Sequence, residues 1–467
     1  MTYFLGKEAF FMQNYSASLT EGPLFKRIIA YTIPIILTGI LQLLFNAADL
    51  VVVGRYCGSV SVGAVGATGA VINLLVNLFV GLSVGAGVTV AHGIGAGRKD
   101  EVHRTIHTAI PTAAICGVIL TIVGVTQSGN ILKLMDTPED TLSLSITYMK
   151  IYFYGITSSL IYNFGASILR AAGDTKSPLY FLTISGIVNV VLNLVFVIVF
   201  NMNVGGVALA TTLSQTLSAV LVILALMKRK DECNFSFKKM RIYKRQLGRI
   251  LGIGFPAGIQ GSLFSISNVI IQSSVNSFGS IVVAGNAAAQ NIEGFVYISM
   301  NSVSQSAMNF AGQNHGAGNL ERIRKTMFIC LGIVLTIGIV MGGSCYLAGR
   351  SLLSIYITDS KEAIESGLVR MMCILIPYFL CGLMDVATGM LRGIGYSVMP
   401  MIITVAGVCG LRIVWIYTIF RIPEYHTLKS LYFSYTISWL CTFLIEFVVF
   451  MILMKRMSKS QANKLPC

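Results

Sequence analysis

Apolar segments long enough to cross a membrane recur along nearly the whole chain, and this pattern excludes most soluble folds. Each segment has 22–30 residues, enough for the roughly 30 Å hydrocarbon core of a bilayer. The twelve segments are 26–53, 63–91, 106–128, 144–168, 178–200, 206–227, 249–278, 283–311, 326–348, 366–390, 399–420 and 430–453. Only 11% of the residues are charged, against about 25% in soluble domains. We therefore predict an all-α integral membrane protein with 12 transmembrane helices.

Basic residues are distributed unequally between the two ends of these segments. If the N-terminus is inside, 25 of the 34 lysines and arginines fall on inward-facing segments, and eight, Arg370 among them, lie near the other side. Positive charge favours the cytoplasmic side, so we expect both termini in the cytoplasm of a multi-pass protein of a prokaryotic cell membrane. The net charge of +15 then follows from topology, and no nucleic-acid partner is expected.

The one long charged break, residues 228–246, divides the chain into two halves of six segments. We predict a cytoplasmic N-terminal segment (1–25), a first lobe (26–227), this basic linker, a second lobe (247–454) and a cytoplasmic tail (455–467). The first 25 residues lack the long apolar core of a signal peptide.

The two halves also repeat each other at an offset of 221 or 222 residues. The matched landmarks are Pro34 and Pro256, Asn46 and Asn268, Gly95-Ala-Gly97 and Gly316-Ala-Gly318, and Leu169-Arg170-x-x-Gly173 and Leu391-Arg392-x-x-Gly395. Because six is an even number, both halves enter the membrane from the same side. We therefore predict two six-helix lobes related by a parallel pseudo-two-fold repeat, a plan known among transporters.

A polar stripe lies on the first apolar segment. Gln42, Asn46 and Asp49 fall at i, i+4 and i+7, on one helix face. An ionisable group inside a membrane span is costly, which makes Asp49 a candidate functional residue. A carboxylate with amide neighbours can take up a proton or a small cation, while the alternative is a polar contact between packed helices.

Other polar groups lie within later segments. Asn189 and Asn193 are one turn apart on the fifth, and Glu293 and Asp385 lie in the second half. We expect the two acids to add negative charge there and to attract cations, with helix packing as the alternative for each. Arg412 and Glu446 stand without a polar stripe, so we interpret them as structural.

Two local patterns resemble cofactor or metal sites but lack what such sites require. Gly93-Ile-Gly-Ala-Gly97 is not followed by Gly-Lys-Ser/Thr and does not predict a phosphate loop. His103 and His107 are one turn apart, but no further ligands accompany them. We expect neither cofactor nor metal, and no Ser-His-Asp set suggests an enzyme.

The two-half plan, the paired turns Gly95-Ala-Gly-Arg-Lys-Asp-Glu101 and Gly312-Gln-Asn-His-Gly-Ala-Gly318, and the Leu-Arg-x-x-Gly turns resemble the multidrug and toxic compound extrusion (MATE) transporters. The resemblance covers about residues 22–455. It implies two lobes around a central cavity, acting as a monomer that exports cationic or amphipathic organic compounds in exchange for H⁺ or Na⁺.

The resemblance also implies a site in the first lobe. Matching positions of the DinF-like branch, which binds the coupling ion or substrate there, are Gln42, Asp49, Tyr148, Asn189, Asn193 and Thr211. Asn193 stands where that branch often has a second aspartate, which puts a sodium site in doubt. The carboxylates of the NorM-like branch are not reproduced, although Asp385 lies one turn from one of their positions.

Two alternatives remain open from the sequence. A lipid-linked precursor flippase of the same wider superfamily would need a cationic cavity for diphosphates. The intramembrane charges counted here are Asp49, Glu293, Asp385 and Glu446 against Arg412, which favours cationic cargo. A membrane-embedded enzyme is the third class, and no clustered nucleophile or metal set supports it.

Overall fold

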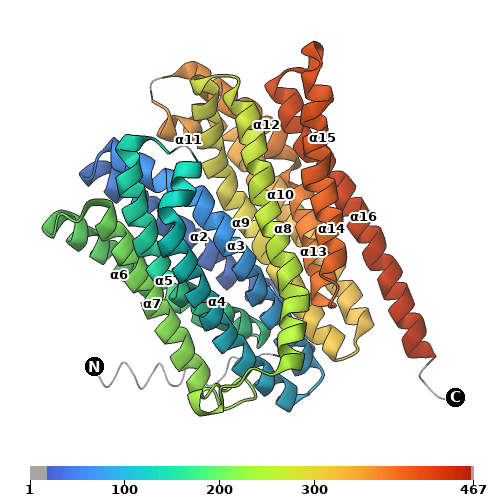
Figure 1. Cartoon of the computed structure of the whole chain (residues 1–467). Helices are drawn as coiled ribbons and strands as arrows, with labels where there is room; N and C mark the ends of the chain where they lie inside the picture. Colours follow the sequence, from blue (N-terminus) through green and yellow to red (C-terminus); the bar gives the residue numbers. More distant parts are fainter. Residues whose placement is uncertain (1–17, 136, 359, 464–467) are drawn as a thin grey trace. The chain divides into compact units, whose positions relative to one another are not determined.

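The computed structural model describes residues 18–135, 137–358 and 360–463, and all regular structure within them is helical (Figure 1). Most of the predicted segment 1–25 and the last four residues of the predicted tail lie outside the described residues. The chain divides into two compact units, Met1–Gly258 and Ile259–Cys467, which are described separately below.

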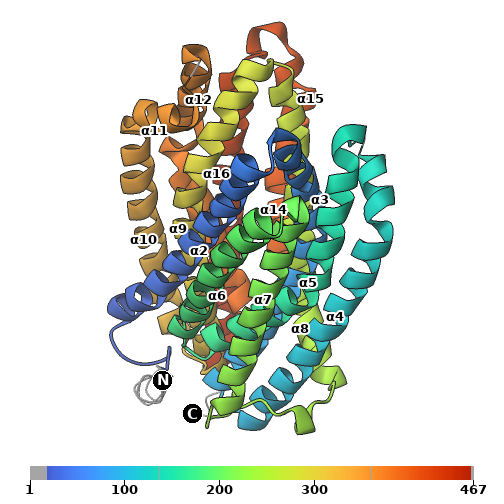
Figure 2. The ribbon, with the colours of Figure 1, turned by 90° about the vertical axis from the view of Figure 1, so that its left-hand side faces the viewer.

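The first unit is a bundle of long helices joined by short turns (Figure 2). Its helices are α2 (Leu24–Tyr56), α3 (Ser59–Gly95), α4 (Lys99–Leu134), α5 (Glu139–Ala171), α6 (Lys176–Leu194), which ends in a π-helical turn (Val195–Val199), and α7 (Asn203–Lys228). Helix α8 (Lys244–Asn276) begins in this unit and continues into the next. Both α2 and α8 run unbroken past their internal prolines, Pro34 and Pro256.

The second unit contains more interrupted helices. After the end of α8 come α9 (Ser280–Gly316), α10 (Leu320–Leu347), α11 (Gly349–Tyr356), α12 (Lys361–Ile374), α13 (Phe379–Gly393), α14 (Val398–Thr404), a π-helical turn (Val405–Gly410), α15 (Leu411–Tyr417) and α16 (Leu428–Ala462). Short 3₁₀ turns lie at Ile376–Tyr378, Ile419–Arg421 and Pro423–Tyr425.

Ten of these helical stretches are long and apolar enough to cross a membrane. The remaining two predicted segments, 144–168 and 283–311, lie within α5 and α9, which are equally long but more polar. Each is central in its unit: α5 packs against α3, α4 and α7, and α9 against α10, α12 and α13. Polar residues are costly on a helix face that contacts lipid, but a helix surrounded by other helices can carry them. This explains why α5 and α9 are less hydrophobic than the other ten helical stretches.

Helix boundaries recur at the spacing found in the sequence. Helices α3 and α9 have 37 residues each and begin 221 residues apart. Helix α5 spans 139–171, and α12 together with α13 spans 361–393, which is 222 residues further on. The offset therefore identifies equivalent positions in the two units.

The division between the two compact units falls inside α8, after Gly258. The first half of α8 lies against α3 with almost no space between the backbones. A Cβ atom on Gly254 would lie 2.6 Å from Leu82 Cα, and one on Gly81 would lie 2.2 Å from the Gly258 nitrogen. Such close approach of small residues is a common means of packing membrane helices.

Replacing Gly254 by alanine should therefore lower thermal stability, because the new methyl group has no room and the helices must separate. Gly252, two residues earlier on α8, is the matched control, since a Cβ there meets nothing within 4 Å. Gly252→Ala should be neutral or stabilising, by about 0.5–1 kcal/mol in a helix interior. Thermal unfolding in detergent measures both, and equal melting temperatures for the two variants would contradict the close packing.

The predicted linker folds back onto the first unit. The Ser236 amide donates to His107 Nε2 (3.1 Å), while His107 Nδ1 lies 2.8 Å from the His103 carbonyl oxygen one turn earlier. Cys233 and Phe235 are buried at 1% exposure. The histidine pair thus has a structural explanation, because His107 anchors the linker backbone.

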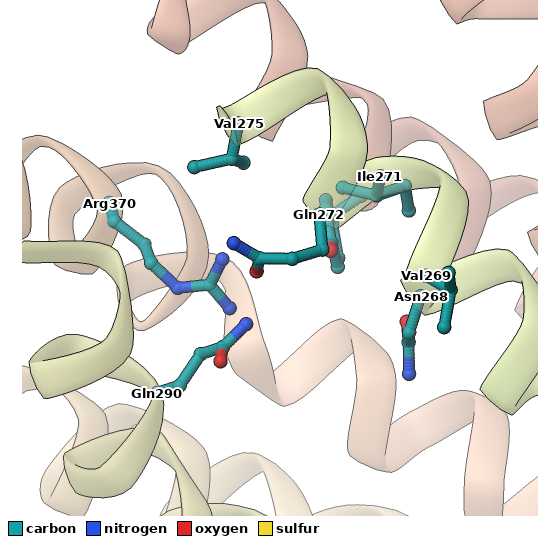
Figure 3. A pocket seen from close by; sticks show the side chains of 8 residues that line it. Asn268, Val269, Ile271, Gln272, Val275, Gln290 and Arg370 are labelled. Carbon is teal, nitrogen blue, oxygen red and sulfur yellow. The ribbon is translucent and has the colours of Figure 1, made fainter. Parts of the chain in front are cut away.

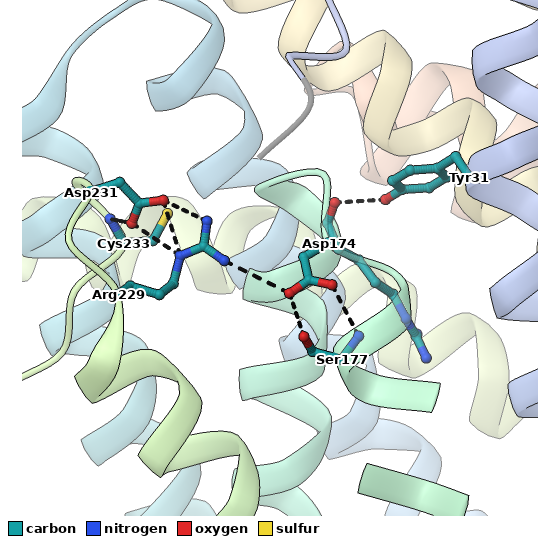
Figure 4. Close-up of polar contacts among 7 residues, drawn as sticks. Tyr31, Asp174, Ser177, Arg229, Asp231 and Cys233 are labelled. Carbon is teal, nitrogen blue, oxygen red and sulfur yellow. Dashed lines mark hydrogen bonds and ion pairs between the residues drawn. The ribbon is translucent and has the colours of Figure 1, made fainter. Parts of the chain in front are cut away.

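A polar network holds the linker against the ends of α5, α6 and α7 (Figure 4). Arg229 donates to Asp231 from Nε (3.0 Å) and from Nη2, and its Nη1 lies 3.9 Å from Asp174 Oδ2. Asp174 in turn accepts from the Ser177 amide (3.0 Å) and hydroxyl (2.6 Å) at the start of α6. Burial alone would raise the pKa of Asp231, but the hydrogen bonds and charge of Arg229 outweigh it and hold that pKa below its usual range.

Arg229→Ala should destabilise the protein by about 1–3 kcal/mol, the usual contribution of hydrogen bonds to charged groups. The exposed neighbour Lys230 provides the matched control, and Lys230→Ala should have little effect. A lowered pKa in the folded state means that Asp231 stabilises the fold above the ordinary carboxylate pKa and loses this effect as the pH falls. The difference in melting temperature between wild type and Arg229→Ala should therefore shrink below about pH 4. A pH-independent difference would show that the ion pair is not its cause.

Candidate functional site

Helix α2 packs against α6, which packs in turn against α7 (Figure 2). Asp49 lies on α2. Asn193 of α6 donates from Nδ2 to Asp49 Oδ1, and Thr211 of α7 donates from its hydroxyl to Asp49 Oδ2 (3.4 Å). Each carboxylate oxygen therefore faces a donor from a neighbouring helix, and the Thr211 hydroxyl proton is shared with the Val207 carbonyl oxygen at 3.0 Å.

Asn189 completes the set, which we call the Asp49 cluster (Asp49, Asn189, Asn193 and Thr211). Its Nδ2 lies 3.4 Å from the Thr211 hydroxyl, and its Oδ1 accepts from Asn193 Nδ2 at 3.3 Å. Asn189 and Asn193 are one turn apart on α6, so both reach the same neighbours. Asn193 is fully buried and Asn189 is 5% exposed, while Asp49 is half-buried.

One side-chain atom of this cluster lacks a hydrogen-bond partner among the described residues. Asn193 Oδ1 is buried and has no hydrogen-bond partner in the described part of the chain. Buried polar atoms are almost always hydrogen-bonded, so each exception needs an explanation. Rotating this amide would present the oxygen to Asp49 instead of the nitrogen.

The other predicted residues of the first lobe form no hydrogen bond to this cluster within the described part of the chain. Gln42 and Asn46 share the α2 face but are exposed, and in the described residues no hydrogen bond connects them to Asp49. Tyr148 of α5 is buried in a hydrophobic cluster with Val52 and Val53, and its ring stacks on Tyr152 at 6.3 Å between centroids. The structure thus brings four of the seven predicted residues together by hydrogen bonds.

In the second unit, Glu293 forms an ion pair that the sequence analysis missed. Arg370 donates to it from Nε (2.8 Å) and from Nη2 (2.7 Å), and both side chains are 5% exposed. Arg370 was counted near the outer side, but it is buried in α12. The expectation that Glu293 adds net negative charge therefore needs correction, because Arg370 neutralises it.

Asp385 of α13 remains a candidate in the second unit. Its Oδ2 is buried without a hydrogen-bond partner among the described residues, and its backbone carbonyl accepts from the Ser304 hydroxyl at 2.5 Å. Asn301 bonds to its side chain. Asp385 thus has one amide contact, where Asp49 has an amide and a hydroxyl.

Glu446 and Arg412 are held by side chains of neighbouring helices. Glu446 is fully buried and accepts from the hydroxyls of Thr388 (2.8 Å) and Thr404 (2.7 Å). The Arg412 guanidinium lies 3.9 Å from the centre of the Tyr435 ring, and its Nε donates to Ser438 at 3.0 Å. These contacts agree with the structural interpretation of both residues.

Comparison with known proteins identifies the family. The MatE family model matches residues 34–195 and again residues 256–418. A relative from Bacillus subtilis, "Probable multidrug resistance protein YoeA", is 26% identical over 82% of this chain and 84% of its own length. "Probable multidrug resistance protein NorM" of Thermotoga maritima is 26% identical over 86% and 87% of the two chains.

A solved structure has the same fold. It is described as the outward-facing conformation of a multidrug resistance MATE family transporter of the MOP superfamily. It superposes with a TM-score of 0.88 at 22% identity and covers 94% of this chain and 98% of its own. The chain therefore belongs to the MatE family, and is a multi-pass membrane transporter of the multidrug and toxic compound extrusion type.

Proposed function

We propose that this protein is a secondary active antiporter that exports cationic or amphipathic organic compounds from the cell in exchange for protons, by alternating access between its two halves. The names of its bacterial relatives support export of drugs. The observation that carries the exchange is the Asp49 cluster, a membrane-embedded carboxylate held by two neighbouring helices.

The charge of Asp49 can be neutralised in two ways that exclude each other, by a bound substrate cation or by a bound proton. When Asp49 is ionised it accepts hydrogen bonds from Asn193 and Thr211, and a substrate cation can balance its charge. When Asp49 is protonated it becomes a donor, and a rotated Asn193 amide would offer the buried Oδ1 as acceptor. Because one carboxylate serves both, proton uptake releases the cation, and the cation displaces the proton.

Sodium is the alternative coupling ion, and the geometry favours it less. Hard cations are held by several oxygen atoms. Here the N–H of Asn193 and the O–H of Thr211 face Asp49. Sodium binding would require both groups to turn their oxygen atoms towards the ion, whereas protonation of Asp49 requires only the Asn193 amide to turn. The cluster also has one acid, since Asn193 stands where a second carboxylate would strengthen cation binding.

The charge argument against the flippase alternative is weaker than the sequence alone suggested. Counting Arg370 reduces the excess of buried acids, so charge alone excludes diphosphate cargo less firmly than the sequence suggested. However, the Asp49 cluster has no role in binding a diphosphate, because its carboxylate would repel one. We propose that the protein acts as a monomer in the cell membrane, with both termini cytoplasmic, and that it is not an enzyme.

The test is transport of ethidium and rhodamine 123 in proteoliposomes, with proton and sodium gradients imposed separately. We expect accumulation that follows the proton gradient and is unchanged by sodium. If a sodium gradient alone drives accumulation, the coupling ion is sodium and not the proton. No gradient-dependent transport of either dye, together with movement of a lipid-linked diphosphate, would favour the flippase.

A further inference from the structure

A cavity of about 390 Å³ opens between α8, α9, α12 and α16 of the second unit (Figure 3). Hydrogen-bonding side chains make up much of its wall. The lining residues that carry the argument are Asn268, Gln272, Gln290, Arg370 and Tyr435. In Figure 3 the Gln272 and Gln290 amides and the Arg370 guanidinium converge on one point of the cavity.

Arg370 is held in a fixed orientation by its buried neighbours. Two of its N–H groups bind Glu293, and one N–H of Nη1 binds Asn286 Oδ1 at 2.8 Å. Asn286 is fixed in turn by the Tyr432 hydroxyl (3.0 Å) and by its own bond to Gln272 (3.1 Å). The side chain is therefore preorganised before any ligand arrives.

Part of the guanidinium is still available for binding. It has five N–H donors. Its bonds to Glu293 and Asn286 use three of them, and a further bond to the Tyr432 side chain leaves one. A charged N–H donor of this kind forms a short, strong hydrogen bond to a carboxylate oxygen. Arg370 is only 4% exposed, and the cavity is where it meets open space.

A second arginine, which does not itself line the cavity, adds positive charge close to its wall. Glu293 cancels the charge of Arg370, but Arg412 lies behind the cavity wall, 3.9 Å from the centre of the Tyr435 ring. Among residues 18–135, 137–358 and 360–463 it has no acidic partner within ion-pair distance. A bound anion would therefore meet one uncompensated positive charge.

The internal repeat shows that this cavity is the counterpart of the region around Asp49 with its polarity reversed. At the offset of 222, Asp49 corresponds to Ile271, Val53 to Val275 and Tyr148 to Arg370. Ile271, Val275 and Arg370 all line the cavity. In the first unit Val53 and Tyr148 share one hydrophobic cluster. One unit thus has an acid where the other has an apolar residue, and a tyrosine where the other has an arginine.

We propose that this Arg370 cavity binds the carboxylate group of an organic compound. The amides of Asn268, Gln272 and Gln290 supply further donors around the carboxylate. Binding of the carboxylate does not depend on the proposed function. Transport of the bound compound rests on that function.

Two dyes that differ in one group test the proposal. Rhodamine 110 carries a free carboxylate, and rhodamine 123 is its methyl ester. Binding to the detergent-solubilised full chain is measured by fluorescence polarisation. We expect Gln290→Glu to weaken binding of rhodamine 110 by about tenfold or more, because the new carboxylate repels the ligand and competes for Arg370. Rhodamine 123 should bind the variant at least as well as the wild type.

The matched control is Asn291→Asp, which adds the same charge at the next, exposed position of α9, outside the cavity lining. It should leave both dyes unaffected. Because Arg370→Gln alone would leave Glu293 unpaired, the double variant Arg370→Gln/Glu293→Gln is the second test, and it should lose the preference for the free acid. The proposal is overturned if wild type shows no saturable binding of rhodamine 110, or if Gln290→Glu affects acid and ester equally. Failure of rhodamine 123 transport would instead count against the antiport proposal.

Discussion

Replacing Asp49 by asparagine should abolish proton-driven accumulation of ethidium while leaving the protein folded. Asparagine keeps the shape and can still bond to Asn193 and Thr211, but it can neither release a proton nor balance a cation. With one proton exchanged per monovalent cation, a pH difference of one unit supports about tenfold accumulation, because 1.4 kcal/mol corresponds to a factor of ten. The variant should reach no accumulation above the passive level.

Asp140→Asn is the matched control, since Asp140 is an exposed acid in the first turn of α5. It should accumulate ethidium as wild type does. Equal melting temperatures of Asp49→Asn and wild type would show that the loss is not unfolding. Accumulation by Asp49→Asn at the wild-type level would mean that another group, with Asp385 the next candidate, carries the proton.

Breaking the Glu293–Arg370 pair should produce the largest loss of stability. Either Glu293→Gln or Arg370→Gln leaves a buried charge without its partner, which typically costs about 3–5 kcal/mol. The double variant leaves no unpaired charge, so it should be more stable than either single variant. Thermal unfolding in detergent of wild type, the two single variants and the double variant gives the coupling energy between the two side chains.

The exposed pair of Arg350 and Glu365 in the same unit provides the comparison. Exposed ion pairs contribute little, so Glu365→Gln should shift the melting temperature much less than Glu293→Gln. Glu293 and Arg370 do not stabilise each other if Glu365→Gln and Glu293→Gln lower the melting temperature equally. The same conclusion follows if the double variant is destabilised by the sum of the two single effects.

Much of the helical architecture was predictable because the bilayer constrains it strongly. Segment length and hydropathy located ten helices that are apolar enough to span. The same reasoning predicted the segments 144–168 and 283–311. These lie within α5 and α9, which pack mainly against other helices of their own unit. The division inside α8 was not predictable, because it depends on the contact of Gly254 with Leu82, which are far apart in sequence.

The candidate site was predictable only in part. Helical spacing and the cost of a buried charge singled out Asp49, and Asn189 and Asn193 share a face by the same spacing. Thr211 came from the family resemblance alone. Gln42 and Asn46 lie on the predicted face, yet they are exposed, because sharing a face does not decide which neighbouring helix the residue meets.

Arg370 was missed because it lies only four residues inside the predicted segment 366–390, where a positive charge suggested a loop end. A signal was present, however. A glutamate as far inside a segment as Glu293 needs a partner, and Arg370 is a basic residue within a span of the same half. Their separation of 77 residues means that helix packing alone brings them together.

Proton countertransport tests the central claim most directly. Proteoliposomes that enclose a pH-sensitive dye receive an imposed ethidium gradient and no pH gradient. Wild type should move protons against the direction of ethidium flow, and Asp49→Asn should move none above protein-free vesicles. Ethidium-driven proton movement through Asp49→Asn at the wild-type rate would contradict the assignment of Asp49 as the coupling residue.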